Sequence, residues 1–157
     1  MEQRRSTLDW IFEFVSAAAL LAAIADVAMH WRLLPERIPT HFGVAGNPDG
    51  WGSRNMLLVL LAVTFAMAVL LTFAESYQQL INIPMSIDRE SPQVKGLLRS
   101  MVIVLKAVIT ITFVWIVDVT MRTAVGEAHG LGRAFLPLFL GATFAPMIYF
   151  LVKLKRL

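Results

Sequence analysis

Four apolar segments separated by polar connections set the pattern of the chain. Each is close to the roughly 20 residues that an α-helix needs to cross the hydrocarbon core of a bilayer. They predict transmembrane helices at about residues 10–30, 56–76, 97–121 and 134–153. The predicted fold class is therefore all-α, a polytopic membrane protein in which residues 1–157 form a single small four-helix bundle.

The connection over residues 34–54 differs from an ordinary linker. Prolines, which lack an amide donor and push the preceding residue towards extended backbone, interrupt it at Pro35, Pro39 and Pro48. The sequence of residues 47–50, Asn-Pro-Asp-Gly, fits a type I turn, and Gly46 permits a positive φ or a close backbone approach. With two aromatic residues, Phe42 and Trp51, the segment predicts an ordered loop folded against the membrane surface.

Composition narrows the class of protein further. Hydrophobic residues make up 57% of the chain and charged residues only 16%, which is typical of polytopic membrane proteins. Cysteine is absent, so disulfides, thiolate nucleophiles and cysteine-based zinc sites are excluded. Basic residues flank the apolar segments and do not form a patch interleaved with aromatics, which excludes nucleic acid as a partner and leaves membrane lipid.

The distribution of Lys and Arg predicts the topology. The N-terminal tail, the second connection and the C-terminal tail carry two, three and three of these residues, against three and two in the first and third connections. Cytoplasmic segments are enriched in Lys and Arg. We therefore expect a multi-pass protein of the bacterial cytoplasmic membrane with both termini in the cytoplasm and residues 34–54 outside.

Ionisable residues inside a span are costly and mark candidate sites. Near the outer ends of the first and third helices, Asp26 and His30, and Asp118 and Arg122, are each four residues apart and so share a helix face. These four residues form the predicted intramembrane polar cluster. Towards the inner boundary the chain has four further charges, of which Glu13 and Lys106 are expected to pair: Asp9, Glu13, Glu75 and Lys106.

The outer side also gathers every histidine of the chain in this topology. Imidazole and carboxylate groups bind zinc and other divalent ions. The candidate metal ligands are His30, His41, His129, Asp26 and Asp118. The alternative is a purely structural polar cluster that ties the loop to the helix ends, with no cofactor.

Motifs for catalysis are absent from the sequence. It has no phosphate-binding Walker loop, no HExxH, no nucleophile elbow and no dinucleotide fingerprint. We therefore predict no catalytic residues and a binding function. Small residues four apart, at Ala18 and Ala22 and at Gly141 and Ala145, permit close helix approach and leave a structural homodimer as an alternative.

Residues of the first connection resemble a known family. The pattern consists of Leu34, Pro35, Ile38, Pro39, His41, Phe42, Gly46, Pro48, Asp49, Trp51, Ser53 and Arg54. It is similar to the bacterial membrane domain of unknown function found at the N-terminus of SdpI-like immunity proteins. The resemblance covers most of residues 10–121, with a specific loop and generic helices, and it implies immunity or signalling linked to a secreted peptide toxin.

The sequence therefore favours binding or sensing of an extracytoplasmic ligand, such as a peptide toxin, a lipid or an envelope signal. The loop residues expected to bind it, or to shape the loop, are Pro39, His41, Phe42, Gly46, Pro48, Asp49, Trp51 and Arg54. The partners expected are membrane lipid, a peptide toxin or envelope protein, or a second copy of the chain. A metal-dependent membrane enzyme or small transporter that uses the outer Asp and His residues is the alternative.

Overall fold

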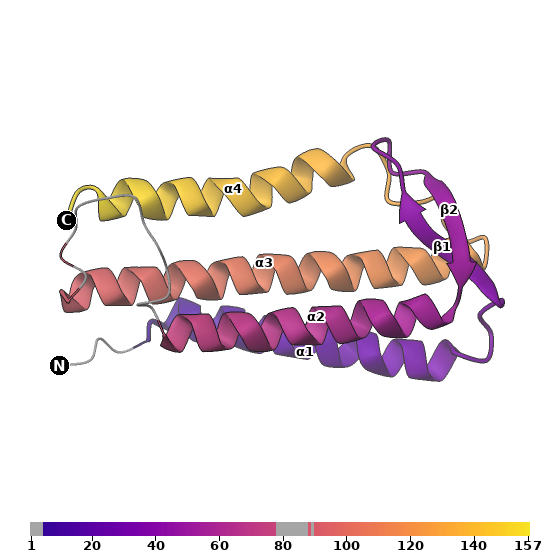
Figure 1. The fold of residues 1–157 in the computed structure, drawn as a ribbon, viewed down its shortest axis with the longest axis horizontal. Coiled ribbons are helices and arrows are strands. Elements are labelled where there is room, and N and C mark those ends of the chain that lie inside the picture. The colour runs from indigo at the N-terminus through magenta and orange to yellow at the C-terminus, as the bar shows by residue number, and fades with distance from the viewer. Residues whose placement is uncertain (1–4, 78–87, 89) are drawn as a thin grey trace.

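The computed structural model describes residues 5–77, 88 and 90–157 (Figure 1). In chain order its elements are α1 (Thr7–His30), β1 (Arg37–Phe42), β2 (Pro48–Ser53), α2 (Asn55–Ser76), α3 (Pro92–Ala124) and α4 (Phe135–Leu154). By length and composition, all four helices are able to cross a membrane. This confirms the all-α, four-helix prediction. Residues 78–87 and 89 of the second connection lie outside the described residues.

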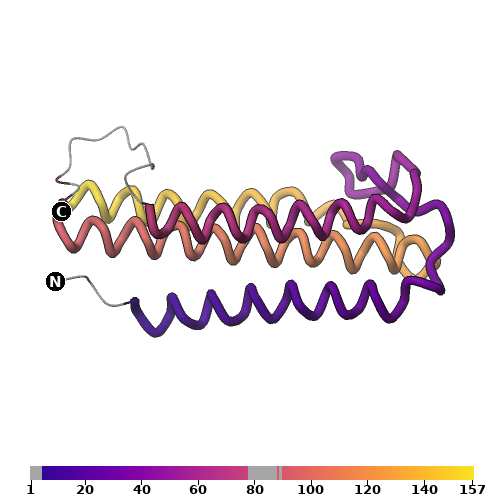
Figure 2. The backbone as a smooth tube through the Cα atoms, turned by 60° about the horizontal axis from the view of Figure 1, so that its bottom comes forward, coloured from indigo at the N-terminus to yellow at the C-terminus, as the bar shows by residue number. Residues whose placement is uncertain are grey.

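The helix α3 is the centre of the bundle. It packs against α1, α2 and α4, whereas α1 and α2 meet at only a few positions (Figure 2). In the most apolar part of α3, 44% of residues are buried inside the protein, against none in α4. The small-residue pairs of α1 and α4, Ala18 and Ala22 and Gly141 and Ala145, are exposed. Most of the apolar surface of the other three helices therefore faces outward, as expected for helices surrounded by lipid.

The start of α1 and the end of α4 lie at one end of the bundle and the two-stranded hairpin lies at the other (Figure 1). We call these the inner and outer ends, after the predicted topology. At 33 residues, α3 is about 50 Å long, longer than the hydrocarbon core of about 30 Å. Its polar first part, residues 92–100, extends beyond the apolar span at the inner end.

The hairpin is anchored by apolar packing. Ile38 of β1 is 1% exposed and belongs to the same buried cluster as Val27, Leu57 and Val117 of the three neighbouring helices. The strands are antiparallel, with Pro39 opposite Trp51 and an irregular register beyond that pair. The first connection is thus ordered, as predicted, but its order takes the form of two paired strands, which the sequence did not predict.

The turn predicted at residues 47–50 is wrong. Pro48 and Gly50 lie in β2, and the chain reverses direction earlier, between Gly43 and Asn47. Gly43 donates to the Asn47 carbonyl at 2.9 Å, and Gly46 adopts φ +77°, a conformation that glycine accommodates without strain. Pro48 is tolerated because it is the first residue of its strand.

Helix α1 begins at Thr7, three residues before the predicted start at about residue 10. Ser6 caps the helix by accepting from the Asp9 amide at 3.1 Å, and the Asp9 carboxylate accepts from the Ser6 amide at 2.8 Å. This reciprocal capping box satisfies two amides that have no partner within the helix. Asp9 is therefore the N3 residue of the capping box, and Ser6 is the N-cap.

Candidate functional site

A pocket of about 380 Å³ lies beneath the hairpin at the outer end. Its walls come from β1, α2, α3, Leu131 of the connection between α3 and α4, and the first residue of α4. Apolar side chains dominate the walls, and among its polar residues are Thr40, His41 and Thr120. Binding pockets for small ligands are usually of this size and mostly apolar, with a few polar groups.

The pocket adjoins the outward face of α2. Met56, Val59 and Val63 line it and are 48%, 49% and 43% exposed, respectively. Its deeper wall is closed by buried residues, Ile38 and Leu57, each 1% exposed. The pocket is therefore open on the outward face of α2 and closed towards the core of the bundle.

His41 and Asp49 form a side-chain contact across the hairpin. His41 Nδ1 lies 2.5 Å from Asp49 Oδ1, and the two side chains are 72% and 52% exposed. Because both groups remain in contact with solvent, the pair contributes at most about 1 kcal/mol to stability. The pair lies at the edge of the pocket, because His41 is also one of the residues that line it. Trp51, which is 47% exposed, lies on the neighbouring strand.

Arg54, which follows β2, stabilises the segment between α1 and β1. Its guanidinium donates to the Leu34 carbonyl at 3.2 Å and to the Trp31 carbonyl at 3.5 Å, and it lies 5.1 Å from the Trp31 ring centroid. Its amide donates to the Glu36 carbonyl at 2.9 Å. Arg54 thus holds the segment that joins α1 to the hairpin, which is a structural role.

Gly46 docks the hairpin onto the connection between α3 and α4. Its carbonyl accepts from the Leu131 amide at 2.8 Å. A Cβ atom on Gly46 would lie 2.4 Å from the Gly132 oxygen, and one on Gly130 would lie 2.2 Å from the Gly46 oxygen. Only glycines allow the two backbones to approach this closely. A positive φ or a close backbone approach at Gly46 was predicted from the sequence, but its partners Gly130 and Gly132 were not.

The predicted outer polar cluster consists of two separate pairs. His30 Nδ1 lies 2.9 Å from Asp26 Oδ1, and Arg122 Nη1 lies 3.8 Å from Asp118 Oδ2. All four side chains are between 42% and 54% exposed. Each pair is local to its own helix, α1 or α3, and both are positioned by the spacing of four residues.

The structure does not gather the candidate metal ligands. Among the described residues, no three His, Asp or Glu side chains lie close enough to hold a metal ion. His30 pairs with Asp26 and His41 with Asp49, while Asp118 pairs with an arginine.

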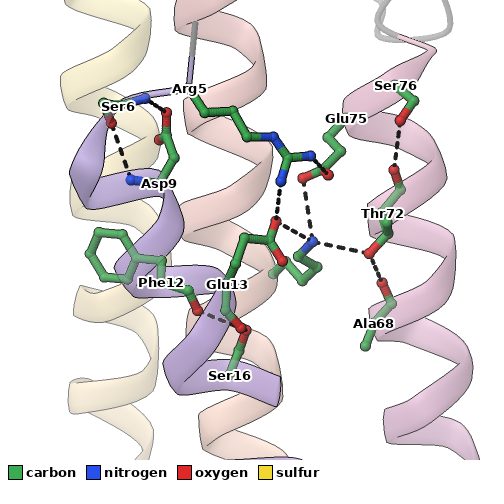
Figure 3. Close-up of polar contacts among 11 residues, drawn as sticks. Arg5, Ser6, Asp9, Phe12, Glu13, Ser16, Ala68, Thr72, Glu75 and Ser76 are labelled. Carbon is green, nitrogen blue, oxygen red and sulfur yellow. Dashed lines mark hydrogen bonds and ion pairs between the residues drawn. The ribbon is translucent and has the colours of Figure 1, made fainter. Parts of the chain in front are cut away.

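A buried ionic network occupies the inner half of the bundle (Figure 3). Its centre is Lys106 of α3, whose side chain is 3% exposed. The ammonium lies 2.7 Å from Glu13 Oε1, 3.0 Å from Thr72 Oγ1 and 3.3 Å from Glu75 Oε2. Arg5 joins the network by donating to Glu75 Oε1 at 2.6 Å, with Glu13 Oε1 3.9 Å away. Two cations and two carboxylates from three helices and the N-terminal segment thus neutralise one another.

The sequence predicted only part of this network. The expected pairing of Glu13 with Lys106 is confirmed. Glu75, 2% exposed at its side chain, was assigned only to the inner boundary, and neither Thr72 nor Arg5 was included. A usable signal was present, because Thr72 and Glu75 are three residues apart and so share a face of α2.

Comparisons with known proteins identify the hairpin region. Residues 17–67 match the family model of a domain of unknown function, DUF1648. An uncharacterized protein of Archaeoglobus fulgidus is 48% identical over 59 residues, an alignment that covers 32% of this chain and 32% of the archaeal protein. No solved structure matches. The chain is a multi-pass membrane protein of four helices that carries a DUF1648 domain at residues 17–67.

Proposed function

We propose that this protein is an SdpI-like membrane protein that binds an extracytoplasmic ligand through the hairpin segment, residues 34–54. The observation that carries the proposal is the apolar pocket of about 380 Å³ between β1 and the outer ends of the helices. The DUF1648 match supports it, because residues 17–67 include the whole hairpin and the whole α2 wall of the pocket. The proposal assigns recognition to this site and no reaction.

The ligand is an amphiphile that partitions into the outer leaflet, as lipids and membrane-active peptides do. Its apolar part enters beside Val59 of α2, where the pocket meets lipid. Its polar part meets His41 at the pocket and the solvent-exposed face of the hairpin, where Asp49 and Trp51 lie. The resemblance to SdpI-like proteins favours a secreted peptide toxin among the natural ligands.

The proposal includes a topology. The hairpin faces the extracytoplasmic side of a bacterial cytoplasmic membrane and both termini face the cytoplasm. The excess of Lys and Arg near the termini supports this orientation. A soluble ligand reaches the hairpin directly, and a lipid-soluble one reaches it through the outer leaflet.

A photoreactive fatty acid tests the pocket. The probe carries a diazirine near the end of its chain and is added to the protein in proteoliposomes. We expect crosslinks concentrated in residues 38–42 and 56–63. Val59→Trp fills the pocket and should reduce these crosslinks severalfold, whereas Leu58→Trp should leave them unchanged, because Leu58 is equally exposed, at 48%, but does not line the pocket. Crosslinks spread evenly over all four helices, or unaffected by Val59→Trp, would contradict the proposal.

A further inference from the structure

A second pocket, of about 460 Å³, lies at the opposite end of the molecule. We call it the basal pocket. It is formed where the start of α1, the first two turns of α3 and the end of α4 meet. The polar residues that line it include Arg5, Ser6, Gln93, Arg99, Ser100 and Lys153.

The basal pocket carries an excess of positive charge. Three cations line it, Arg5, Arg99 and Lys153, each from a different segment of the chain. Asp9 is the one acidic side chain among the described residues that line it, and its carboxylate is engaged by the Ser6 amide. Arg5 is already paired with Glu75 of the buried network, so Arg99 and Lys153 are the cations assigned to the ligand.

The uncharged polar residues of the pocket complement a ligand with several acceptor oxygens. Ser6 and Ser100 offer hydroxyls and Gln93 offers an amide. Arginine and lysine form strong charge-assisted hydrogen bonds with phosphate oxygens, and the planar arginine side chain is able to donate two at once. This combination of two cations, Arg99 and Lys153, with neutral donors is suited to a phosphate monoanion.

The depth of the basal pocket indicates where the phosphate comes from. Helix α1 begins at Thr7 and α4 ends at Leu154, so the pocket lies where the apolar spans end and lipid headgroups begin. Leu97 and Leu157 also line it, and the inner apolar cluster of Leu98, Phe150 and Leu154 is built from the same two helices, α3 and α4. A headgroup in this position keeps its acyl chains beside the apolar surface of the bundle.

We infer that the basal pocket binds the headgroup phosphate of an anionic phospholipid in the cytoplasmic leaflet. The inference is independent of the outer pocket, since it uses other residues at the other end of the bundle. It gives Arg99 and Lys153 a specific role beyond the general attraction of basic tails to anionic membranes.

Native mass spectrometry of the purified full-length protein tests the inference, with phosphatidylglycerol and phosphatidylcholine of identical acyl chains as probes. We expect the wild type to bind phosphatidylglycerol more tightly. The double variant Arg99→Gln/Lys153→Gln should bind it roughly tenfold more weakly, because two cations near the headgroup are lost. The matched control Lys155→Gln/Arg156→Gln removes the same charge from exposed neighbours that do not line the pocket and should keep the preference.

A single variant protects the test against misfolding. Lys153 is exposed in the last turn of α4, so Lys153→Glu leaves the packing intact and should also abolish the preference for phosphatidylglycerol. The inference is overturned if the Arg99 and Lys153 variants keep that preference, or if the Lys155 and Arg156 variant loses it equally. It is also overturned if inorganic phosphate at low millimolar concentration displaces the lipid, since the ligand would then be free phosphate.

Discussion

The two ends of the bundle hold their charged residues in opposite ways. At the outer end, His41 and Asp49 pair in contact with solvent, and the hairpin is fixed by buried Ile38 and by backbone contacts at Gly46. At the inner end, Lys106 is buried among carboxylates and joins three helices by side-chain contacts. The outer pair is therefore exposed to solvent, whereas the charges around Lys106 are enclosed by the bundle.

Removing the central cation should have the largest effect. Lys106→Met leaves Glu13 and Glu75 without the ammonium that both contact. Breaking a buried ion pair from one side typically costs about 3–5 kcal/mol. We expect a loss of this size in the free energy of unfolding, measured by denaturant titration in detergent. Adding Glu75→Gln should recover part of it, and a loss below about 1 kcal/mol for Lys106→Met would show that the network is not a stabilising centre.

Separating the hairpin from the helix connection should have the next largest effect. Gly130→Ala places a Cβ atom 2.2 Å from the Gly46 oxygen at a residue with φ +126°. Strain of this kind costs about 1–3 kcal/mol, so we expect faster amide hydrogen exchange in residues 43–47. Gly126→Ala is the control for φ alone, because φ is +82° there and the added Cβ meets nothing within 4 Å. Equal exchange rates in the two variants would show that the close contact between Gly46 and Gly130 does not hold the hairpin in place.

Loss of the first helix cap should have a moderate effect. Ser6→Ala removes the hydroxyl that accepts from the Asp9 amide. Loss of such a cap costs about 1 kcal/mol. Thermal unfolding should show a correspondingly small drop in Tm, and Ser6→Asn, which restores an accepting side chain, should recover it. A drop as large as that of Lys106→Met would mean that Ser6 has a further role.

The outer ion pairs should have the smallest effect on stability. Asp49→Asn and Asp118→Asn each weaken an exposed pair, and such pairs contribute about 0–1 kcal/mol. Chemical unfolding should therefore barely distinguish either variant from the wild type. The two should differ in ligand binding, because Asp49 pairs with His41 at the pocket and Asp118 does not line it. A large loss of stability in either variant would contradict the contrast between the two ends.

The length of the apolar segments was sufficient to predict the spans, because the thickness of the bilayer sets a minimum length for a crossing helix. The hairpin was not predictable in the same way. Its strands are short, β1 contains Pro39 and β2 contains two glycines, so local preference for strand is weak. The pairing depends on tertiary contacts, namely burial of Ile38 and the hydrogen bond from Leu131 to Gly46.

The candidate sites show the same limit. Pairs four residues apart, such as Asp26 and His30, follow from helix geometry. The contact between Glu75 and Lys106 depends on how α2 and α3 are aligned along the bundle, which the sequence does not specify. The pocket beneath the hairpin is also built from segments distant in sequence, so only the folded chain reveals it.

Cysteine labelling in intact cells tests the outward orientation of the hairpin most directly. The chain has no cysteine, so a single one can be introduced at Val44, 85% exposed in the hairpin turn, or at Lys155 near the C-terminus. A membrane-impermeant maleimide should label Val44→Cys in intact cells and Lys155→Cys only after permeabilisation. Labelling of Lys155→Cys but not Val44→Cys in intact cells would place the hairpin in the cytoplasm and contradict the account.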